Sequence, residues 1–353
     1  MIEARIAKTF LPGPESAAFA LDVEFQAGPG VTVLFGPSGS GKTLTLDCIA
    51  GFTRPDRGRI LLDDQILFDA AAAVNFRPQA RHCGYVFQNY ALFPHMTLRQ
   101  NLMFAAERQP RLERRRRVNE MLERFHLREF AGRRPHEVSG GQKQRCSIAR
   151  ALISNPRLLL FDEPARGLDA PLRIEFYALL RELRSEFRIP MLLVTHDIEE
   201  CLAVGDALLV YDAGRIAQSG TPHQVAERPA NQDVARLLGI GNLFEAEILA
   251  LDPGRRTSRI RVGERELTGA YFPGHFRGDR VSFYVRPQDV SVHPEPGDNR
   301  IPATLLHVFE RVESVRLEFL GGISAEVPRS EYERQKDNEA WQVEFPPSAI
   351  RLL

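Results

Sequence analysis

Short apolar segments alternate with amphipathic segments along most of the first 238 residues. Three continuous apolar runs, Leu158–Phe161, Pro190–Thr195 and Ala207–Tyr211, have the length of strands rather than of helices. Because they are apolar at every position, we expect strands that are covered on both faces of a sheet. The pattern predicts βαβ units and a largely parallel α/β sheet over residues 1–238. Between the first two runs, apolar residues recur at the spacing of one helix face: Leu172, Phe176, Leu179, Leu180, Leu183 and Phe187.

The pattern changes near Leu238. Thr221-Pro222 predicts a helix start, and the helical stretch that follows ends before Gly239. Beyond it, short strand-like segments are separated by glycine and proline turns, and Arg316–Phe319 alternates polar with apolar residues. We therefore predict a second, all-β and barrel-like domain over residues 241–353. Its expected strands are Phe244–Leu251, Ser258–Val262, Val281–Val285, Val315–Leu320 and Trp341–Phe345.

A glycine-rich segment joins an expected strand, Val31–Phe35, to an expected helix start, Leu44–Ala50. Its spacing is that of a P-loop, in which backbone N–H groups and a helix N-terminus converge on phosphate oxygens. We expect Lys42 to reach the outer phosphates and the Thr43 hydroxyl to bind Mg²⁺. The alternative is an ordinary glycine turn. The segment consists of Gly36, Pro37, Ser38, Gly39, Ser40, Gly41, Lys42 and Thr43.

Polar side chains stand at the ends of three further apolar runs. Asp162 and Glu163 follow one strand, and we expect Asp162 to bind Mg²⁺ and Glu163 to act as the general base. His196 ends the next strand, where it could bind the γ-phosphate and orient water. Gln88 ends the run that begins at Tyr85, and its amide is a candidate ligand of Mg²⁺ or of the attacking water. The alternative is that the acidic pair only caps a turn and that His196 is structural.

A second candidate phosphate cradle lies at a later helix start. Ser139 is followed by Gly140, Gly141 and Gln142, and a serine with two glycines at a helix N-terminus can bind phosphate. One nucleotide does not need two cradles from one chain. We therefore expect a homodimer in which this segment covers the γ-phosphate held by the partner chain. A helix-capping turn is the alternative.

Taken together, these motifs resemble the nucleotide-binding subunit of an ABC transporter. The resemblance covers residues 1–238 and implies a P-loop ATPase with a helical subdomain, ATP and Mg²⁺ as cofactors, and two subunits that close around two ATP molecules. The matching motifs are the signature Ser139-Gly140-Gly141-Gln142, the Q-loop residue Gln88, the Walker B pair Asp162-Glu163, the switch histidine His196 and the D-loop Gly167-Leu168-Asp169.

Three positions depart from the family pattern. The signature is preceded by Val138 where leucine is usual, and the D-loop has Arg166-Gly167 where Ser-Ala is common. The second change implies altered communication between the two subunits. The aromatic residue that stacks on adenine in this family is not obvious here, because the loop from Leu11 to Ala18 differs. Phe10 is the candidate.

The β-rich extension resembles the regulatory domain of bacterial importers, chiefly in the strand and turn Val285–Val290. Within that group the segments Gly30–Phe35 and Asp63–Gln88 are most similar to molybdate importers, so molybdate is the favoured solute. Sulfate, ferric ion or another solute stays open. The resemblance implies membrane permease subunits as partners and a periplasmic solute-binding protein as an indirect one. It also implies contact with the permease through Asn89–Leu102, which contains the apolar residues Leu92, Phe93 and Met96. The alternative is that these three residues belong to the local core.

The amino-acid composition limits the kinds of partner and the cellular location that we expect for this chain. The 353 residues include 46 basic and 46 acidic side chains, and a net charge of zero does not suit a protein that binds nucleic acid by bulk charge. The basic run Arg111–Arg117 is expected to be a solvated helix face, or else to contact a partner or lipid headgroups. No apolar run is long enough to span a bilayer, and the residues after Met1 lack the apolar region of a signal peptide. We expect a peripheral subunit at the cytoplasmic face of the plasma membrane.

The four cysteines lack metal-binding spacing, and we expect reduced thiols that serve in packing: Cys48, Cys83, Cys146 and Cys201. Two functions of other classes remain as alternatives. One is a soluble ABC ATPase that acts in DNA repair or translation, although such proteins usually carry two nucleotide domains or a coiled-coil insertion. The other is an oxyanion-sensing module formed by residues 241–353.

Overall fold

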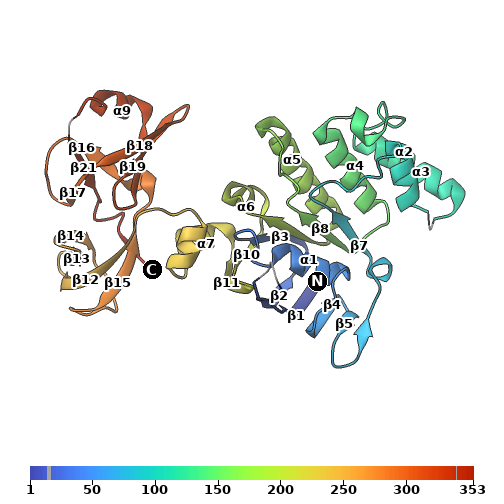
Figure 1. Cartoon of the computed structure of the whole chain (residues 1–353), viewed down its shortest axis with the longest axis horizontal. Helices are drawn as coiled ribbons and strands as arrows, with labels where there is room; N and C mark the ends of the chain where they lie inside the picture. Colours follow the sequence, from blue (N-terminus) through green and yellow to red (C-terminus); the bar gives the residue numbers. More distant parts are fainter. Residues whose placement is uncertain (14–16, 108, 339) are drawn as a thin grey trace. The chain divides into compact units, whose positions relative to one another are not determined.

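The computed structural model describes residues 1–13, 17–107, 109–338 and 340–353. They form two compact units, Met1–Val225 and Ala226–Leu353, whose elements are labelled in Figure 1. The predicted difference from family members in the loop between Leu11 and Ala18 involves residues 14–16, which lie outside the described residues.

A mainly parallel sheet forms the centre of the first unit. Its strand order is β11-β10-β3-β9-β8-β7, and every neighbouring pair is parallel except β10 and β11. Strands β3, β8 and β9 are buried at every position, as their continuous apolar sequences predicted, whereas β10 is buried except at its two end residues, Ala207 and Asp212. The strands are β3 (Gly30–Phe35), β7 (Cys83–Val86), β8 (Leu158–Asp162), β9 (Pro190–Thr195), β10 (Ala207–Asp212) and β11 (Arg215–Gly220).

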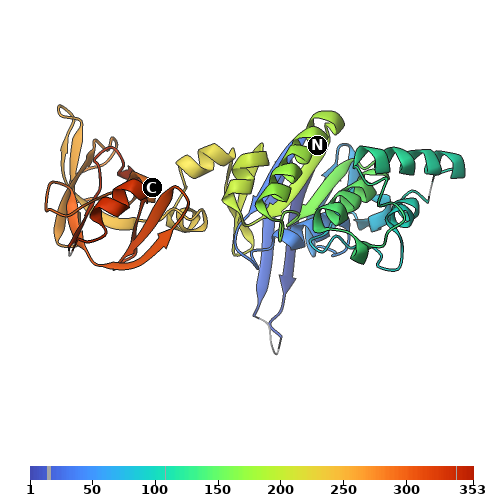
Figure 2. The same cartoon turned by 90° about the horizontal axis from the view of Figure 1, so that it is seen from above.

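An antiparallel sheet with the order β2-β1-β4-β5-β6 completes this core. Figure 2 shows β1 and β2 side by side as a long blue hairpin. Helix α1 (Lys42–Ala50) contacts β1, β8 and β9, so it lies between the two sheets, and its residues Leu46 and Ile49 are fully buried there. The strands are β1 (Ile2–Phe10), β2 (Phe19–Ala27), β4 (Arg57–Leu62), β5 (Gln65–Asp69) and β6 (Val74–Asn75).

A helical layer follows β7 in the sequence, as the family resemblance implied (Figure 1). Helix α2 (Leu98–Ala105) contacts both α3 (Arg111–Arg124) and α4 (Gly140–Leu152), and α4 also contacts β7. Helix α5 (Ala170–Phe187) joins β8 to β9, and α6 (Ile198–Val204) joins β9 to β10, so the predicted βαβ units are confirmed. The short helices η1 (Pro78–Ala80) and η2 (Pro135–Glu137) lie in the connections.

The second unit is β-rich and has one core, as predicted. Its strands form three sheets with the orders β14-β13-β12-β15-β22, β16-β21-β17 and β18-β19-β20, and residues of all three sheets share one hydrophobic cluster. Strand β19 alternates half-buried with buried positions, in line with its sequence. The elements are α8 (Gln232–Leu237), β12 (Leu243–Asp252), β13 (Thr257–Val262), β14 (Arg265–Ala270), β15 (Arg280–Tyr284), η3 (Pro287–Asp289), β16 (Ser291–His293), β17 (Arg300–Ala303), β18 (Leu305–Glu310), β19 (Ser314–Phe319), β20 (Ile323–Pro328), α9 (Arg329–Gln335), β21 (Trp341–Glu344) and β22 (Arg351–Leu352).

The two units divide between Val225 and Ala226, within α7 (Pro222–Glu227) and earlier in the chain than the change of sequence character near Leu238. Within the second unit, hydrogen bonds connect the segment that precedes its first strand to strand β15. Tyr284 donates its hydroxyl to the Glu227 carbonyl at 2.6 Å, and Gln232 donates from Nε2 to Ser282 Oγ at 2.7 Å.

Within the described part of the chain, no helix combines the length and the apolar character that crossing a membrane requires.

Candidate nucleotide-binding and hydrolysis site

The P-loop connects β3 to α1, and its glycines are required by backbone geometry. Gly36 and Gly41 have φ angles of 152° and 103°, which L side chains rarely adopt. A Cβ at Gly36 would lie 2.3 Å from the Tyr211 carbonyl oxygen, so β10 closes that side of the loop. Helix α1 begins after Gly41 with no side chain capping its N-terminus. An uncapped helix N-terminus beneath a glycine-rich loop suits an anionic ligand such as a phosphate.

Lys42 is the cation of this loop. Its ammonium group donates to the carbonyls of Gly36 at 2.8 Å and Pro37 at 2.7 Å, and it lies 3.4 Å from Ser40 Oγ. Burial lowers the pKa of Lys42, while the charges of Glu163 and Asp162 act in the opposite direction. A buried ammonium held only by neutral oxygens is a favourable partner for phosphate, since a negative charge compensates for its lost hydration.

Thr43 and Asp162 face each other across the junction of α1 and β8. The Thr43 hydroxyl donates to Asp162 Oδ1 at 2.8 Å, and burial raises the pKa of Asp162, opposed by this hydrogen bond. Hard oxygen ligands of this kind suit Mg²⁺, which uses one or two protein carboxylates and completes its shell with phosphate and water. The residues present therefore fit Mg²⁺. Among the described residues, no group of three or more His, Cys, Asp or Glu side chains is placed to hold a metal ion.

Glu163 directly follows β8, and side chains from two other strand ends converge on its half-buried carboxylate. Gln88, two residues beyond β7, donates from Nε2 to Oε2 at 3.3 Å, and His196, directly after β9, lies 3.5 Å from Oε1 through Nδ1. The structure thus brings together three residues that the sequence analysis placed at the ends of separate apolar runs. This arrangement gives a carboxylate, an amide and an imidazole at one edge of the sheet, where parallel sheets bind ligands.

The Glu163 carboxylate has a further partner that the sequence analysis did not foresee. Arg166 donates from Nη1 to Glu163 Oε2 at 2.8 Å. The two residues also close a turn, because the Arg166 N–H donates to the Glu163 carbonyl at 3.1 Å. A glutamate and an arginine three residues apart were visible in the sequence, but whether they pair depends on the turn.

A small hollow of about 150 Å³ adjoins these residues. Glu200 lines it from α6, and burial raises the pKa of this carboxyl to about 7. Sequence reasoning missed Glu200 because a glutamate on a helix is usually exposed. The hollow is lined by Glu163, Ala165, Arg166, Gly167, Arg173, Thr195, His196, Asp197 and Glu200.

The signature segment belongs to the helical layer. Ser139 is the N-cap of α4: its Oγ accepts from the Gln142 N–H at 3.3 Å, and Gln142 Oε1 accepts from the Ser139 N–H at 2.9 Å. The capping alternative is therefore realised within this chain. Since α4 contacts β7 and α2 whereas α1 contacts β1, β8 and β9, the two candidate cradles belong to different layers. Asp169 of the D-loop caps α5 by accepting from the Leu172 N–H at 3.1 Å. The roles of these residues at a partner's nucleotide stay predictions.

Phe10, the candidate for stacking on adenine, is 43% exposed at the end of β1, and the Lys8 ammonium lies 5.5 Å from its ring centre. Phe19, which pairs with Phe10 across β1 and β2, lies against the P-loop, because a Cβ at Gly41 would be 3.2 Å from its Cζ. The sequence analysis did not consider Phe19. Its proximity to the loop makes it a second aromatic candidate.

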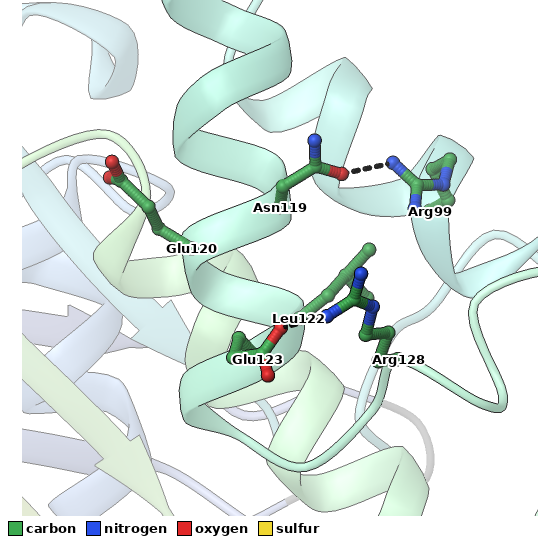
Figure 3. A pocket seen from close by; sticks show the side chains of 6 residues that line it. All are labelled: Arg99, Asn119, Glu120, Leu122, Glu123 and Arg128. Carbon is green, nitrogen blue, oxygen red and sulfur yellow. Dashed lines mark hydrogen bonds and ion pairs between the residues drawn. The ribbon is translucent and has the colours of Figure 1, made fainter.

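The expected permease-contact segment is only partly exposed. Leu92, Phe93 and Met96 are half-buried, and the Phe93 ring packs edge-on against Phe104 at 4.9 Å between ring centres. A hollow of about 380 Å³ lies elsewhere in the helical layer, and Figure 3 shows Arg99 of α2 reaching Asn119 of α3 at its edge. None of the residues lining this hollow belongs to the P-loop or contacts Glu163. They are Arg99, Asn119, Glu120, Leu122, Glu123 and Arg128.

Two further sequence predictions can be compared with the structure. The cysteines are free thiols, three of them buried, and burial raises the pKa of Cys48 and Cys146 to about 12, as expected of packing residues. In the second unit, a hollow of about 440 Å³ mixes Arg265 and Arg300 with three carboxylates. Such a mixed lining gives no particular support to an oxyanion sensor.

Comparison with known proteins extends these observations. A family model described as ABC transporter matches residues 20–166. The chain is 36% identical over 302 residues to a molybdenum import ATP-binding protein of Paramagnetospirillum magneticum, covering 82% of this chain and 81% of that protein. It is 40% identical over 280 residues to a spermidine/putrescine import ATP-binding protein of Nitratidesulfovibrio vulgaris, covering 77% and 73%. It is 36% identical over 349 residues to a sulfate/thiosulfate import ATP-binding protein of Nitrosomonas europaea, covering 94% and 92%.

A solved structure has the same nucleotide-binding fold. It is the dimeric post-hydrolysis state of an ATP-binding cassette bound to ADP and Pi, with a TM-score of 0.55 and 28% identity, and the match covers 63% of this chain and 99% of that one.

Proposed function

The chain belongs to the ABC transporter family as the ATP-binding subunit of an importer, and we propose that it hydrolyses ATP at the site described above to drive molybdate uptake. The observation that carries the chemical part is the convergence of Gln88 and His196 on the Glu163 carboxylate. The Thr43–Asp162 pair supplies the oxygen atoms that would bind Mg²⁺ beside it.

Each residue has a defined part in the proposed reaction. Lys42 binds the outer phosphates and compensates for their charge. Thr43 and Asp162 would hold Mg²⁺, which would stabilise negative charge on the phosphates. Glu163 accepts a proton from the attacking water as the water oxygen bonds to the γ-phosphorus, and the bond from that phosphorus to the bridging oxygen breaks to leave ADP.

The proposed orienting groups lie on both sides of the base. His196 binds the γ-phosphate, and Gln88 binds the attacking water or Mg²⁺. Both reach Glu163 from strand ends, which supports their use in positioning a water molecule beside this carboxylate.

The active assembly is proposed to be a homodimer. Ser139 and its glycines form the start of α4 in a different layer from the P-loop, which supports their use on a partner's nucleotide. The similar ATP-binding cassette is itself described as dimeric. The expected further partners are membrane permease subunits, contacted through the segment that contains Phe93, and indirectly a periplasmic solute-binding protein. The subunit would then act as a peripheral protein at the cytoplasmic face of the plasma membrane.

Molybdate is the proposed solute because a molybdenum import protein matches over 82% of the chain at 36% identity. Relatives named for spermidine/putrescine and for sulfate/thiosulfate match at 40% and 36% identity, so these solutes are the alternatives. Uptake of each labelled solute by cells that lack this chain separates them. We expect only molybdate uptake to be lost, and normal molybdate uptake with impaired sulfate or spermidine uptake would overturn the assignment.

The ATPase assignment is tested with the purified chain. Glu163→Gln should reduce ATP turnover by at least about 100-fold, because the carbonyl of an amide is a far weaker base than a carboxylate. ATP binding, measured by calorimetry, should change by less than about twofold. The exposed Glu199 provides a matched control, since Glu199→Gln should leave turnover near that of the unaltered chain. Turnover of Glu163→Gln near the control value would show that another group is the base.

A further inference from the structure

Both oxygens of the Glu163 carboxylate are already occupied by protein groups. Oε2 accepts from Arg166 Nη1 at 2.8 Å and from Gln88 Nε2 at 3.3 Å, and Oε1 faces His196 Nδ1 at 3.5 Å. Each carboxylate oxygen offers about two lone-pair sites, so Oε2 has none left for a water molecule. A general base must lie within hydrogen-bond reach of the proton that it accepts. In this arrangement Oε2, the oxygen that Arg166 holds, is closed to a water molecule, and only Oε1 beside His196 has a site left.

Arg166 is held beside Glu163 by the local backbone. The residues are three apart, the turn between them is closed by the Arg166 N–H, and Pro164 stands at the second turn position, where proline fixes φ. Glu163 itself has φ of 44°, an unfavourable conformation for a glutamate, with its N–H bonded to the Val194 carbonyl at 3.0 Å. The turn, held to β9 through Val194, thus places the guanidinium beside the carboxylate.

The exposure of the two side chains indicates how the ion pair can open. The Arg166 side chain is 59% exposed while that of Glu163 is 15% exposed, so the arginine can move into water at small cost and free the base.

We propose that Arg166 is a positioning residue that holds Glu163 in an unreactive ion pair and thereby restrains ATP turnover until the pair opens. The inference rests on the proposed role of Glu163 in hydrolysis. Arg166 stands where the family commonly has a small residue. A small side chain at this position could not provide the proposed restraint.

The test compares steady-state ATP turnover of the full chain with that of its Arg166 variants. Arg166→Ala should raise kcat by about two- to fivefold, the size expected for a partly exposed ion pair, and leave KM for ATP unchanged. Arg166→Lys keeps the charge but loses the planar guanidinium, so its kcat should lie between that of the unaltered chain and that of Arg166→Ala. Arg116→Ala is the matched control, because Arg116 pairs with Glu113 at the same spacing and at 2.7 Å on an exposed helix face. It should not change kcat.

The proposal is overturned if Arg166→Ala has the same kcat as the unaltered chain, or a lower one, while melting at the same temperature. If that variant melts early, Arg166→Gln, which keeps a long polar side chain, takes its place with the same expected gain. Adding Arg166→Ala to Glu163→Gln should give no gain, because there is no base to release. Failure of the assignment of Glu163 as the base is recognised separately, since Glu163→Gln would then turn over like the unaltered chain.

Discussion

The Thr43 hydroxyl donates a 2.8 Å hydrogen bond to Asp162 Oδ1, although 119 positions separate the two residues in the sequence. The bond joins the first turn of α1 to the last residue of β8. Two oxygens suited to Mg²⁺ therefore face each other in the folded chain, and the metal would replace the proton that now joins them.

Asp162→Asn tests this pair. The amide keeps the shape of the side chain but lacks the negative charge, so the Mg²⁺ concentration for half-maximal turnover should rise by about tenfold or more. A magnesium titration of ATP turnover measures the change. The exposed Asp64 supplies the control, and Asp64→Asn should titrate like the unaltered chain. An unchanged magnesium requirement in Asp162→Asn would remove Asp162 from the metal site.

Lys42→Ala should weaken ATP binding by roughly 10- to 100-fold, the loss expected when a hydrogen bond to a charged group is removed. Calorimetric titration with ATP and Mg²⁺ gives the dissociation constant directly. Lys336→Ala is a suitable control because its ammonium pairs with Glu333 on the surface of the second unit. Equal affinity in the two variants would contradict the assignment of the phosphate loop.

Ser139→Arg should prevent ATP-driven dimerisation while leaving ATP binding by the monomer within about twofold. A large charged side chain at the start of α4 would keep a partner's nucleotide from approaching the two glycines. The measurement is sedimentation of the Glu163→Gln chain, which retains ATP, with and without Ser139→Arg. Ser185→Arg, at an exposed position of α5, is the control. A dimer that persists in Ser139→Arg would rule out the shared site.

Glu200→Gln should change the pH dependence of stability. Burial raises the pKa of Glu200 to about 7, so between the ordinary carboxyl range and about pH 7 the folded chain binds the proton and the unfolded chain does not. The free energy of unfolding therefore falls as pH rises through that window, by up to about 1.4 kcal/mol per unit of pKa shift. An uncharged glutamine removes this penalty.

We expect Glu200→Gln to gain stability relative to the unaltered chain between pH 5 and pH 8. Urea unfolding should be followed by helical circular dichroism, because the only tryptophan, Trp341, lies in the second unit. A stability difference that is constant across this pH range would mean that Glu200 does not titrate as stated.

The central sheet could be predicted because the residues of each strand indicate by themselves that the strand is buried. Leu158–Phe161 is apolar at every position, which indicates a strand whose two faces are both covered. The phosphate loop was equally accessible, since Gly36 and Lys42 occur at a spacing that follows from backbone geometry alone. Even the meeting of Gln88, Glu163 and His196 was predictable, because the carboxyl ends of parallel strands share one edge of a sheet.

Other features depend on neighbours that are distant in sequence. The antiparallel sheet of β1, β2 and β4 was not predicted, since its strands are half exposed and their pairing joins separate segments. Arg81 is a further case: it is fully buried, and its guanidinium donates to the carbonyls of Cys48 and Ile49 at the end of α1, both at 2.8 Å. An arginine is normally exposed, and here the unpaired carbonyls of a helix end, together with the Phe76 carbonyl and Asn75 Oδ1, make its burial favourable.

The amino-acid sequence alone determined which chemistry the first unit carries, because phosphate loops and strand-end carboxylates are local patterns. Only the tertiary structure decided how those groups are held. The ion pair of Arg166 with Glu163 depends on the turn after β8, and the burial of the Glu200 carboxyl depends on the packing of α6. Side-chain pairing and desolvation are set by three-dimensional surroundings, and residue identity does not specify them.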